Sequence, residues 1–295
     1  MKILLIFSGA LGDFINFIPF IEHIKLNFKN PEITIITKSY FFPIIEKIDS
    51  KISKIDFEYT PIYKLYNHNP DFSRLEFLKN FDLIITFTGV KNEIFRKNLE
   101  KLNRNSHFIF PINKDEKISE ALYLINSFPF KKKFFPKPNI PIKLKDRKFI
   151  AIHPGSGDKR KNVKIDFFYE LSKELDYPVV LFGGENEVDL AEKFKIKICK
   201  NLNEVFEIFE NTLFYIGNDS GISHLAGSCN IPGIVFFGPT NYKIWKPVGE
   251  KILVIRKNLN CSPCNLNCKK GYECLNFDFK EIKSLILNYL KNVFD

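Results

Sequence analysis

The sequence lacks the features of a membrane-spanning or exported chain. No apolar run reaches the ~18 to 20 residues that a helix needs to cross a bilayer. Residues 1–7 form a short apolar stretch without a small-residue cleavage site, so we expect no signal peptide. These absences predict a cytoplasmic protein.

Three common phosphate-binding patterns are also absent. A dinucleotide fingerprint G-x-G-x-x-G starting at Gly9 would need glycine where Leu11 and Phe14 stand. The glycine loop at 155–161 does not have the spacing G-x-x-x-x-G-K-[ST], which disfavours an NTP-hydrolysing P-loop. No Asp-x-Asp sequence occurs that would hold a divalent ion against a diphosphate. We therefore predict no metal and no cofactor.

Acidic residues are too few to balance the basic ones, and the formal net charge is +10. This excess favours an anionic partner, such as a nucleotide, a phosphorylated lipid or a membrane surface. No nucleic-acid motif is present, so we expect no nucleic-acid partner. The run Lys131–Lys133 beside Phe134 and Phe135 would suit peripheral contact with an anionic inner membrane. The alternative is an ordinary solvated surface rich in lysine.

The first half of the chain alternates strand and helix patterns. The expected strands are residues 2–8, 32–38, 54–59, 82–88 and 106–111, and the expected helices are residues 14–28, 92–102 and 116–127. The second half repeats the alternation, with strands at 148–153, 178–182, 197–200, 213–217 and 233–237 and helices at 166–175, 187–194, 203–211, 222–229 and 279–293. Such alternation predicts mostly parallel sheets covered on both faces.

Residues 129–147 interrupt the pattern with four prolines and no periodic apolar face. Proline stiffens such a segment, so we interpret it as an interdomain linker. The predicted fold class is α/β, with two Rossmann-like doubly wound parallel-sheet domains facing across a cleft. The expected domains are residues 1–140 and 141–278, followed by a C-terminal helix in 279–295.

The run of residues 217–227 is the most informative for function. It follows an apolar stretch, and residues 222–226 then have helical spacing. Asp219, Ser220 and Gly221 therefore fall where a strand ends and a helix begins. The first N–H groups of a helix favour an anion, and ligands bind at this edge of an open α/β sheet. The alternative is an ordinary capped helix.

A second turn follows the first expected strand. Gly9, Ala10, Leu11 and Gly12 form a loop of mostly small residues that lets the backbone approach a ligand closely. Asp13 then stands at the first turn of the next helix. It is either a helix N-terminal charge, worth ~0.3 to 1 kcal/mol, or a general base that accepts a hydroxyl proton.

A third turn, residues 153–162, combines glycines with the cations Lys159, Arg160 and Lys161. Backbone N–H groups with Lys or Arg are suited to a pyrophosphate, although an exposed basic loop is the alternative. Two further small-residue turns occur at 182–187 and 236–241. We expect these turns to lie at one edge of the sheet and to form a nucleotide-binding site.

Together these segments resemble glycosyltransferase family 9, the lipopolysaccharide heptosyltransferases, which have the GT-B fold. The matching segments, in the family's order, are Gly-Ala-Leu-Gly-Asp at 9–13, His-Pro-Gly-Ser-Gly at 153–157, Phe-Gly-Gly-Glu at 182–185, Asn-Asp-Ser-Gly-Ile-Ser-His-Leu-Ala at 218–226 and Phe-Gly-Pro-Thr at 237–240. The resemblance implies transfer of heptose from ADP-heptose to the inner core of a lipopolysaccharide (Kdo-lipid A) acceptor, with inversion at the anomeric carbon.

The resemblance also implies residue roles. Asp13 corresponds to the catalytic base and Lys161 to a phosphate-binding lysine. The residues implied at the donor site are Ser156, Lys159, Lys161, Glu185, Asp219, Ser220, Gly221 and His224. The N-terminal domain would bind an anionic glycolipid acceptor, the C-terminal domain would bind the nucleotide sugar, and the last helix would pack back onto the N-terminal domain.

Two departures from the family leave alternatives open. Val163 and Lys164 stand where the family usually has Trp-Pro, so Lys159, Arg160 and Lys161 all remain choices for the phosphate contact. The compact N-terminal half leaves the acceptor and the linkage open. A GT-B transferase using another nucleotide sugar and a catalytically silent nucleotide- or sugar-binding protein are the alternatives. Asp13 together with the cationic loop favours an enzyme.

Six cysteines occur, and four of them follow the spacing Cys261-x2-Cys264-x3-Cys268-x5-Cys274. Clustered cysteines in a cytosolic chain suggest a metal site, but this spacing matches no standard zinc pattern. Free thiols, a disulfide-stapled loop and a metal site therefore all remain open. Two further cysteines, Cys199 and Cys229, lie in apolar stretches and are expected in the core.

Overall fold

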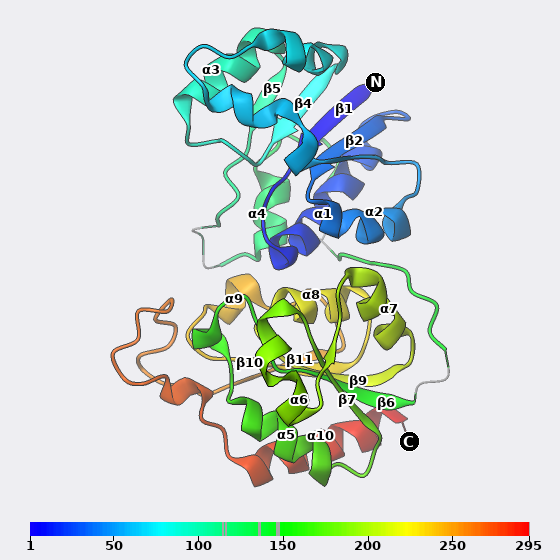
Figure 1. Ribbon diagram of the computed structural model, residues 1–295, viewed down its shortest axis with the longest axis vertical. Coiled ribbons are helices and arrows are strands. Elements are labelled where there is room, and N and C mark those ends of the chain that lie inside the picture. The colour runs from blue at the N-terminus through cyan, green and yellow to red at the C-terminus, as the bar shows by residue number, and fades with distance from the viewer. Residues whose placement is uncertain (114, 116, 135–136, 146–147, 295) are drawn as a thin grey trace. The chain divides into compact units, whose positions relative to one another are not determined.

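A computed structural model describes residues 1–113, 115, 117–134, 137–145 and 148–294. The chain forms two compact units, Met1–Pro138 (unit 1) and Asn139–Asp295 (unit 2) (Figure 1). Each unit has its own parallel sheet, and among the described residues no strand pairing joins the two sheets. The division after residue 138 falls two residues before the boundary expected after residue 140.

Unit 1 contains five strands and several helices between them. They are β1 (Lys2–Ile6), α1 (Leu11–Asn27), β2 (Glu32–Thr37), η1 (Ser39–Phe41), α2 (Phe42–Ile48), β3 (Ser53–Asp56), η2 (Phe57–Tyr59), η3 (Pro61–Tyr66), η4 (Phe72–Asn80), β4 (Leu83–Thr86), α3 (Glu93–Leu102), β5 (Ser106–Phe108) and α4 (Glu120–Asn126). The strands lie in the order β3-β2-β1-β4-β5, all parallel.

The central strand of unit 1 is buried on both faces. Leu4 and Ile6 belong to the cluster formed with η3, η4 and α3. On the other face, the Phe7 ring stacks on Phe17 of α1 at 4.8 Å and meets Phe14 edge-on at 5.7 Å. A strand covered on both faces needs an unbroken apolar sequence, which explains the run Ile-Leu-Leu-Ile-Phe.

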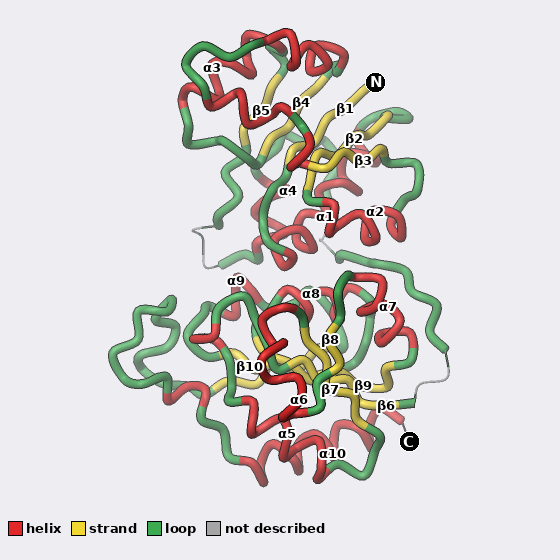
Figure 2. Tube along the Cα trace, in the orientation of Figure 1, coloured by secondary structure: helices red, strands yellow, loops and turns green. Residues whose placement is uncertain are grey.

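Unit 2 repeats this architecture with one further strand. Its elements are β6 (Phe149–His153), η5 (Lys159–Lys161), α5 (Ile165–Glu174), β7 (Val179–Gly183), η6 (Glu185–Leu190), α6 (Ala191–Phe194), β8 (Lys197–Ile198), α7 (Leu202–Glu210), β9 (Thr212–Asn218), α8 (Gly221–Ser228), β10 (Gly233–Phe237), α9 (Tyr242–Trp245), β11 (Ile252–Arg256), η7 (Glu273–Leu275) and α10 (Phe279–Phe294). The strands follow the order β11-β10-β9-β6-β7-β8. Figure 2 shows them in yellow, with the helices around them in red.

Both sheets therefore reverse their strand order beside their first strand. The reversal lies between β1 and β4 in unit 1 and between β6 and β9 in unit 2. At such a switch point the two loops leave the sheet in opposite directions and open a crevice at the carboxyl ends of the strands. The turns singled out in the sequence, 9–13, 153–162 and 217–221, all follow these strands.

The C-terminal helix corrects one expectation. Ile282, Ile286 and Leu290 of α10 are buried in the core cluster of unit 2, against β6, β9, β10 and α5. Lys283 of α10 also pairs with Glu174 of α5 at 2.8 Å. The prediction that this helix packs back onto the N-terminal domain is wrong, because its apolar stripe covers the sheet face beside α5.

The Pro-rich segment is bound to the units at both of its ends. The Phe134 ring stacks on His23 of α1 at 4.0 Å, and its N–H donates to His23 Nε2 at 3.1 Å. In unit 2, the Ile140 N–H donates to the Ser228 carbonyl at 2.9 Å. The expected linker at 129–147 is thus anchored along most of its described length.

Parts of three expectations lie outside the described residues. These are residues 135–136 and 146–147 of the linker, Phe135 of the basic aromatic run and residue 116 of the helix expected at 116–127. That helix, α4, begins at Glu120. In the part of the chain that the structure describes, no helix combines the length and apolarity needed to cross a bilayer.

Candidate active site

Asn218 joins two loops at the switch point of unit 2. It is the last residue of β9 and is fully buried. Its Nδ2 donates to the Pro154 carbonyl at 2.7 Å, and its Oδ1 accepts the Val163 N–H at 3.1 Å. One side chain thus holds both ends of loop 154–163 beside the start of α8. The sequence predicted this loop and this helix start but did not reveal the contact between them.

The start of α8 is capped from within. Ser220 is the N-cap residue, and its Oγ accepts the Ser223 N–H at 3.3 Å. Ser223 Oγ in turn lies 2.9 Å from the buried Tyr215 hydroxyl. The Ser220 hydroxyl is thus used as the helix cap. The groups at the start of α8 that can bind an anion are therefore the first backbone N–H groups, beginning with that of Gly221.

Loop 154–163 separates its three cations. Arg160 forms an ion pair with Asp158, with 2.6 Å between Nη2 and Oδ2. Lys159 is exposed. Lys161 turns toward the start of α8, where its Nζ lies 3.4 Å from Asp219 Oδ2. Ser156 does not point outward, because its hydroxyl donates to the Asp158 carbonyl at 2.8 Å and stabilises the loop itself.

Asp219 connects that lysine to a further turn. Its Oδ2 accepts the Thr240 hydroxyl at 2.6 Å, and the residue is only 5% exposed. Thr240 belongs to the turn after β10 that the sequence placed on the same edge. Lys161, Asp219 and Thr240 therefore form one chain of polar contacts across three strand ends. A lysine paired in this way keeps a fixed direction while remaining near the helix start.

Glu187, rather than Glu185, is the carboxylate buried among the loops at this edge of unit 2. Glu185 is exposed, whereas Glu187 is 8% exposed and accepts the Gly184 N–H at 2.8 Å. A Cβ at Gly155 would lie 2.2 Å from Glu187 Oε1, so any larger residue there would displace this carboxylate. Burial raises the pKa of Glu187. The sequence signal that could have identified it is its place three residues after Gly184, the N-cap of η6.

Two buried histidines complete the edge of unit 2. His153 ends β6 and His224 lies on α8, and burial lowers the pKa of each to about 4. Both rings are therefore neutral at pH 7. The Nδ1 atom of each ring has no hydrogen-bond partner among the described residues. Buried polar atoms are usually satisfied, so two such nitrogens at one sheet edge are unusual.

The corresponding edge of unit 1 carries a carboxylate instead of cations. α1 begins at Leu11, two residues before Asp13, whose Oδ2 accepts the Ala10 N–H at 3.1 Å. Across the switch point, Ser8 Oγ and Thr88 Oγ1 lie 2.8 Å apart. The predicted loop therefore has Asp13 in the first turn of the helix, as expected.

Glu120 is a second carboxyl near this edge that the sequence analysis did not identify. It lies at the start of α4, which packs on α1, and is 1% exposed. Its Oε2 accepts the Asn113 N–H at 3.0 Å. Burial, assisted by the negative charge of Asp13, raises the pKa of Glu120 to about 7. A carboxyl so deeply buried had no signal in the sequence, because its helix was predicted only as a periodic pattern.

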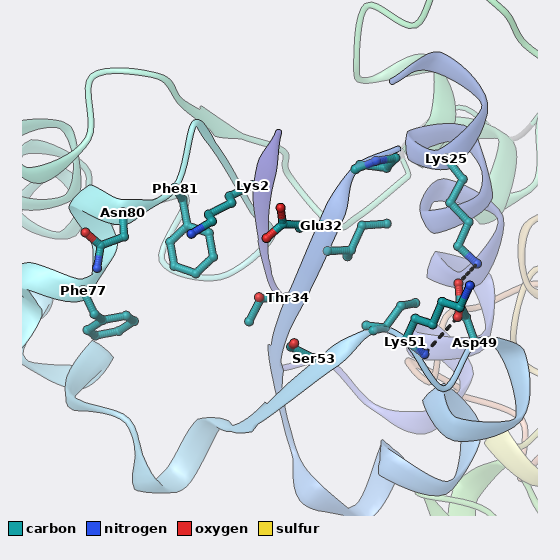
Figure 3. A pocket seen from close by; sticks show the side chains of 13 residues that line it. Lys2, Lys25, Glu32, Thr34, Asp49, Lys51, Ser53, Phe77, Asn80 and Phe81 are labelled. Carbon is teal, nitrogen blue, oxygen red and sulfur yellow. Dashed lines mark hydrogen bonds and ion pairs between the residues drawn. The ribbon is translucent and has the colours of Figure 1, made fainter. Parts of the chain in front are cut away.

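A pocket of about 740 Å³ lies at the opposite end of the unit 1 sheet (Figure 3). Its walls include Lys2, Glu32 and Ser53, which begin β1, β2 and β3. In Figure 3, Lys25 reaches toward Asp49, with which it forms an ion pair at 2.9 Å. None of the predicted site residues lines this pocket, so we do not assign the proposed reaction to it.

The described residues contain no group of three or more His, Cys, Asp or Glu side chains placed to hold a metal ion. The structure brings Ser156, Lys161, Asp219, Ser220, Gly221 and His224 to one edge of unit 2. Gly9 to Asp13 lie at the corresponding edge of unit 1.

Comparison with known proteins agrees with this arrangement. The sequence model of glycosyltransferase family 9 (heptosyltransferase) matches residues 102–272, more than half of the chain. A lipooligosaccharide heptosyltransferase 2 of Campylobacter jejuni is 24% identical over an alignment of 326 positions, which covers 99% of each chain.

Two solved structures show the same fold. E. coli ADP-heptose LPS heptosyltransferase II is similar with a TM-score of 0.77 at 15% identity, covering 100% of both chains. E. coli heptosyltransferase WaaC with ADP is similar with a TM-score of 0.67 at 14% identity, covering 98% of this chain and 100% of that chain. The predicted GT-B arrangement of two parallel-sheet units is therefore confirmed at the level of fold.

Proposed function

The chain belongs to glycosyltransferase family 9, the heptosyltransferases, and we propose that it transfers heptose from ADP-heptose to the inner core of a Kdo-lipid A acceptor with inversion at the anomeric carbon. One observation carries the proposal for the donor site. Lys161 is held at the start of α8 by Asp219, which Thr240 fixes from a third strand end.

In the proposed donor site, the diphosphate binds between Lys161 and the first N–H groups of α8. A helix N-terminus and a lysine both favour phosphate oxygens. Asp219 repels a diphosphate and so acts by directing Lys161 rather than by touching the phosphate. The neutral rings of His153 and His224 offer hydrogen bonds without adding charge.

Unit 1 supplies the base in this proposal. Asp13 takes the proton of the acceptor hydroxyl while that oxygen attacks the anomeric carbon and the bond from this carbon to the diphosphate breaks. A single displacement inverts the configuration at the carbon. The negative charge that develops on ADP is stabilised by Lys161 and the α8 N-terminus, which lie where this charge appears.

The acceptor and the place of action remain part of the proposal. The net charge of +10 favours an anionic glycolipid and peripheral contact with the inner face of an anionic membrane. A transferase for another nucleotide sugar and a silent nucleotide-binding protein are the alternatives, which the following experiment separates.

The test combines nucleotide titration with a turnover assay. Calorimetric titrations with ADP, UDP and GDP should show preferential binding of ADP. Mixing ADP-heptose with Kdo-lipid A should then release ADP and give a heptosylated glycolipid, detected by mass spectrometry. Tighter binding of UDP or GDP would favour another donor. Binding of ADP without turnover on any lipopolysaccharide-core acceptor would favour the silent binding protein.

A further inference from the structure

The four clustered cysteines form a loop, residues 261–274, that is independent of the chemistry proposed above. All four carry free thiols in the structure. Cys274 is 4% exposed, whereas Cys264 and Cys268 are partly accessible. Sulfur is therefore available to solvent at a part of unit 2 to which no role has been given.

This cysteine loop is hydrogen-bonded to the turn after β10. The backbone N–H groups of Cys264 and Asn265 both donate to the Pro239 carbonyl, at 3.0 Å and 2.8 Å. The Ser262 hydroxyl donates to the Gly238 carbonyl at 2.6 Å. Three hydrogen bonds thus fix the turn from one side, and any rearrangement of the cysteine loop alters them together.

The same turn reaches the proposed donor site. Thr240 follows Pro239 directly and donates to Asp219, the partner of Lys161. Tyr272 of the cysteine loop also lies near Arg160 in loop 154–163. The cysteine loop therefore contacts the turn that bonds to Asp219 and lies near the loop that carries Lys161.

Cys268 has the surroundings of a reactive thiolate. Its Sγ accepts the N–H groups of Lys270 at 3.4 Å and Tyr272 at 3.3 Å. These hydrogen bonds lower the pKa of Cys268. The Asn267 N–H donates to the Cys264 carbonyl at 3.0 Å, and this turn brings Cys268 back toward Cys264. Burial raises the pKa of Cys264. An accessible thiolate beside a second thiol is the usual arrangement of a redox-sensitive pair.

We propose that Cys268 and Cys264 form a reversible disulfide that weakens nucleotide binding in unit 2. The regulatory consequence rests on the proposed function, whereas formation of the disulfide does not. The oxidant is a peroxide, and the reductant is a small-molecule thiol.

The chemistry takes two steps. The Cys268 thiolate attacks one oxygen of hydrogen peroxide, the O–O bond breaks, and hydroxide leaves, giving a sulfenic acid at Cys268. The Cys264 thiol then attacks that sulfur, forming the S–S bond and releasing water. Two thiol exchanges with a reducing thiol reverse the process, reducing the disulfide and oxidising the small thiols.

The disulfide changes the contacts described above. Bonding to Cys264 takes the Cys268 sulfur away from the N–H groups of Lys270 and Tyr272. The backbone at Tyr272, which lies near Arg160, shifts when this bond to sulfur is lost. The backbone of Cys264 moves with its side chain, which weakens the hydrogen bonds from the N–H groups of Cys264 and Asn265 to the Pro239 carbonyl.

Mass spectrometry of the full chain tests the disulfide. Under excess peroxide followed by removal of the oxidant, the protein should lose two hydrogens, and peptide mapping should join Cys264 to Cys268. Cys264→Ser and Cys268→Ser should each abolish this link. Cys261→Ser, in the same loop, is the matched control and should retain it. Linkage of another pair, or a stoichiometric metal ion held by the purified protein with all four thiols protected, would overturn the proposal.

ADP titration tests the consequence. The oxidised protein should bind ADP on the order of 5- to 150-fold more weakly than the reduced protein, the range expected for coupled sites. Reduction should restore the affinity, and Cys268→Ser should be insensitive to peroxide. Equal affinities of the oxidised and reduced protein overturn the regulatory role. If the reduced protein does not bind ADP at all, the proposed donor and this consequence both fail, while the peptide map still decides the disulfide.

Discussion

The two units have the same strand order but place opposite charges at their switch points. Unit 1 has two carboxyls there, Asp13 and Glu120, and one of them is almost completely buried. Unit 2 has Lys161 beside a helix start, held in place by Asp219. In the proposed reaction, unit 1 supplies the base for the acceptor hydroxyl and unit 2 supplies positive charge for the leaving diphosphate.

The way each unit supports its site also differs. In unit 2, Asn218 and Thr240 bond across strand ends and fix the loops through side chains. In unit 1, the Ala10 N–H bonds to the Asp13 carboxylate within one helical turn, and the Ser8 hydroxyl bonds to the Thr88 hydroxyl across adjacent strands. The same topology can therefore be adapted to different chemistry by a few residues at the strand ends.

The largest expected effect separates the base from donor binding. Asp13→Asn keeps the shape of the side chain but removes its basicity. General-base catalysis contributes roughly 10²- to 10⁴-fold, so turnover should fall by about that factor while ADP affinity in unit 2 stays the same. Steady-state kinetics and calorimetry measure the two quantities. Glu22→Gln, which neutralises a partly exposed carboxylate on the same helix, is the control. Near-normal turnover of Asp13→Asn would exclude this base.

The second prediction concerns stability in unit 1. Because the pKa of Glu120 is raised from 4.5 to about 7, its stabilising contribution is complete below pH 4.5 and lost as the pH rises to about 7. Glu120→Gln keeps an oxygen for the Asn113 N–H but does not titrate. Relative to wild type, the variant should gain on the order of 3 kcal/mol between these limits, measured by urea unfolding.

The matched control for that prediction is Glu76→Gln, an exposed residue of unit 1 whose carboxylate is 55% accessible. Its stability should run parallel to that of the wild type across the same pH range. If the Glu120→Gln curve is parallel too, burial does not raise the pKa of Glu120, and this carboxyl is charged in the folded protein at neutral pH.

The third prediction distinguishes neighbouring cations in unit 2. Lys161→Ala should weaken ADP binding by ~1.5 to 3 kcal/mol, the range for a hydrogen bond to a charged group. Lys159→Ala removes the same charge from an exposed position and should have a smaller effect, because exposed charges are screened. Calorimetry compares them directly, and a larger loss in Lys159→Ala would transfer the phosphate contact to Lys159.

The smallest expected effect tests the support of Asp219. Thr240→Val keeps the size of the side chain but removes the hydroxyl that bonds to Asp219. ADP affinity should fall by about 0.5 to 1.5 kcal/mol, the net value of one hydrogen bond, because Lys161 still pairs with Asp219. Thr60→Val removes a comparable hydroxyl bond to Phe57 in unit 1 and should not change the titration. Equal losses in both variants would point to a general effect on stability.

The sequence predicted most strands to within a few residues, because each is a short apolar run followed by small or polar residues. It missed β11, although Ile252–Ile255 is an apolar run like the others, and α2, which at seven residues is too short to show a clear helical period. It also placed the start of α1 three residues late, since Leu11 and Gly12 were interpreted as loop. A boundary depends on hydrogen bonds of the first turn, which composition does not specify.

Residue types at strand ends determined which turns could carry chemistry: small residues before Asp13, glycines with cations at 153–162, and Asp-Ser-Gly at the start of α8. Only the tertiary structure showed which of the three adjacent cations turns toward the start of α8, and that Glu187 is buried whereas Glu185 is exposed. It also brought α10 onto unit 2 and Asn218 between two loops. These choices depend on contacts between residues far apart in the chain, and periodicity describes only near neighbours.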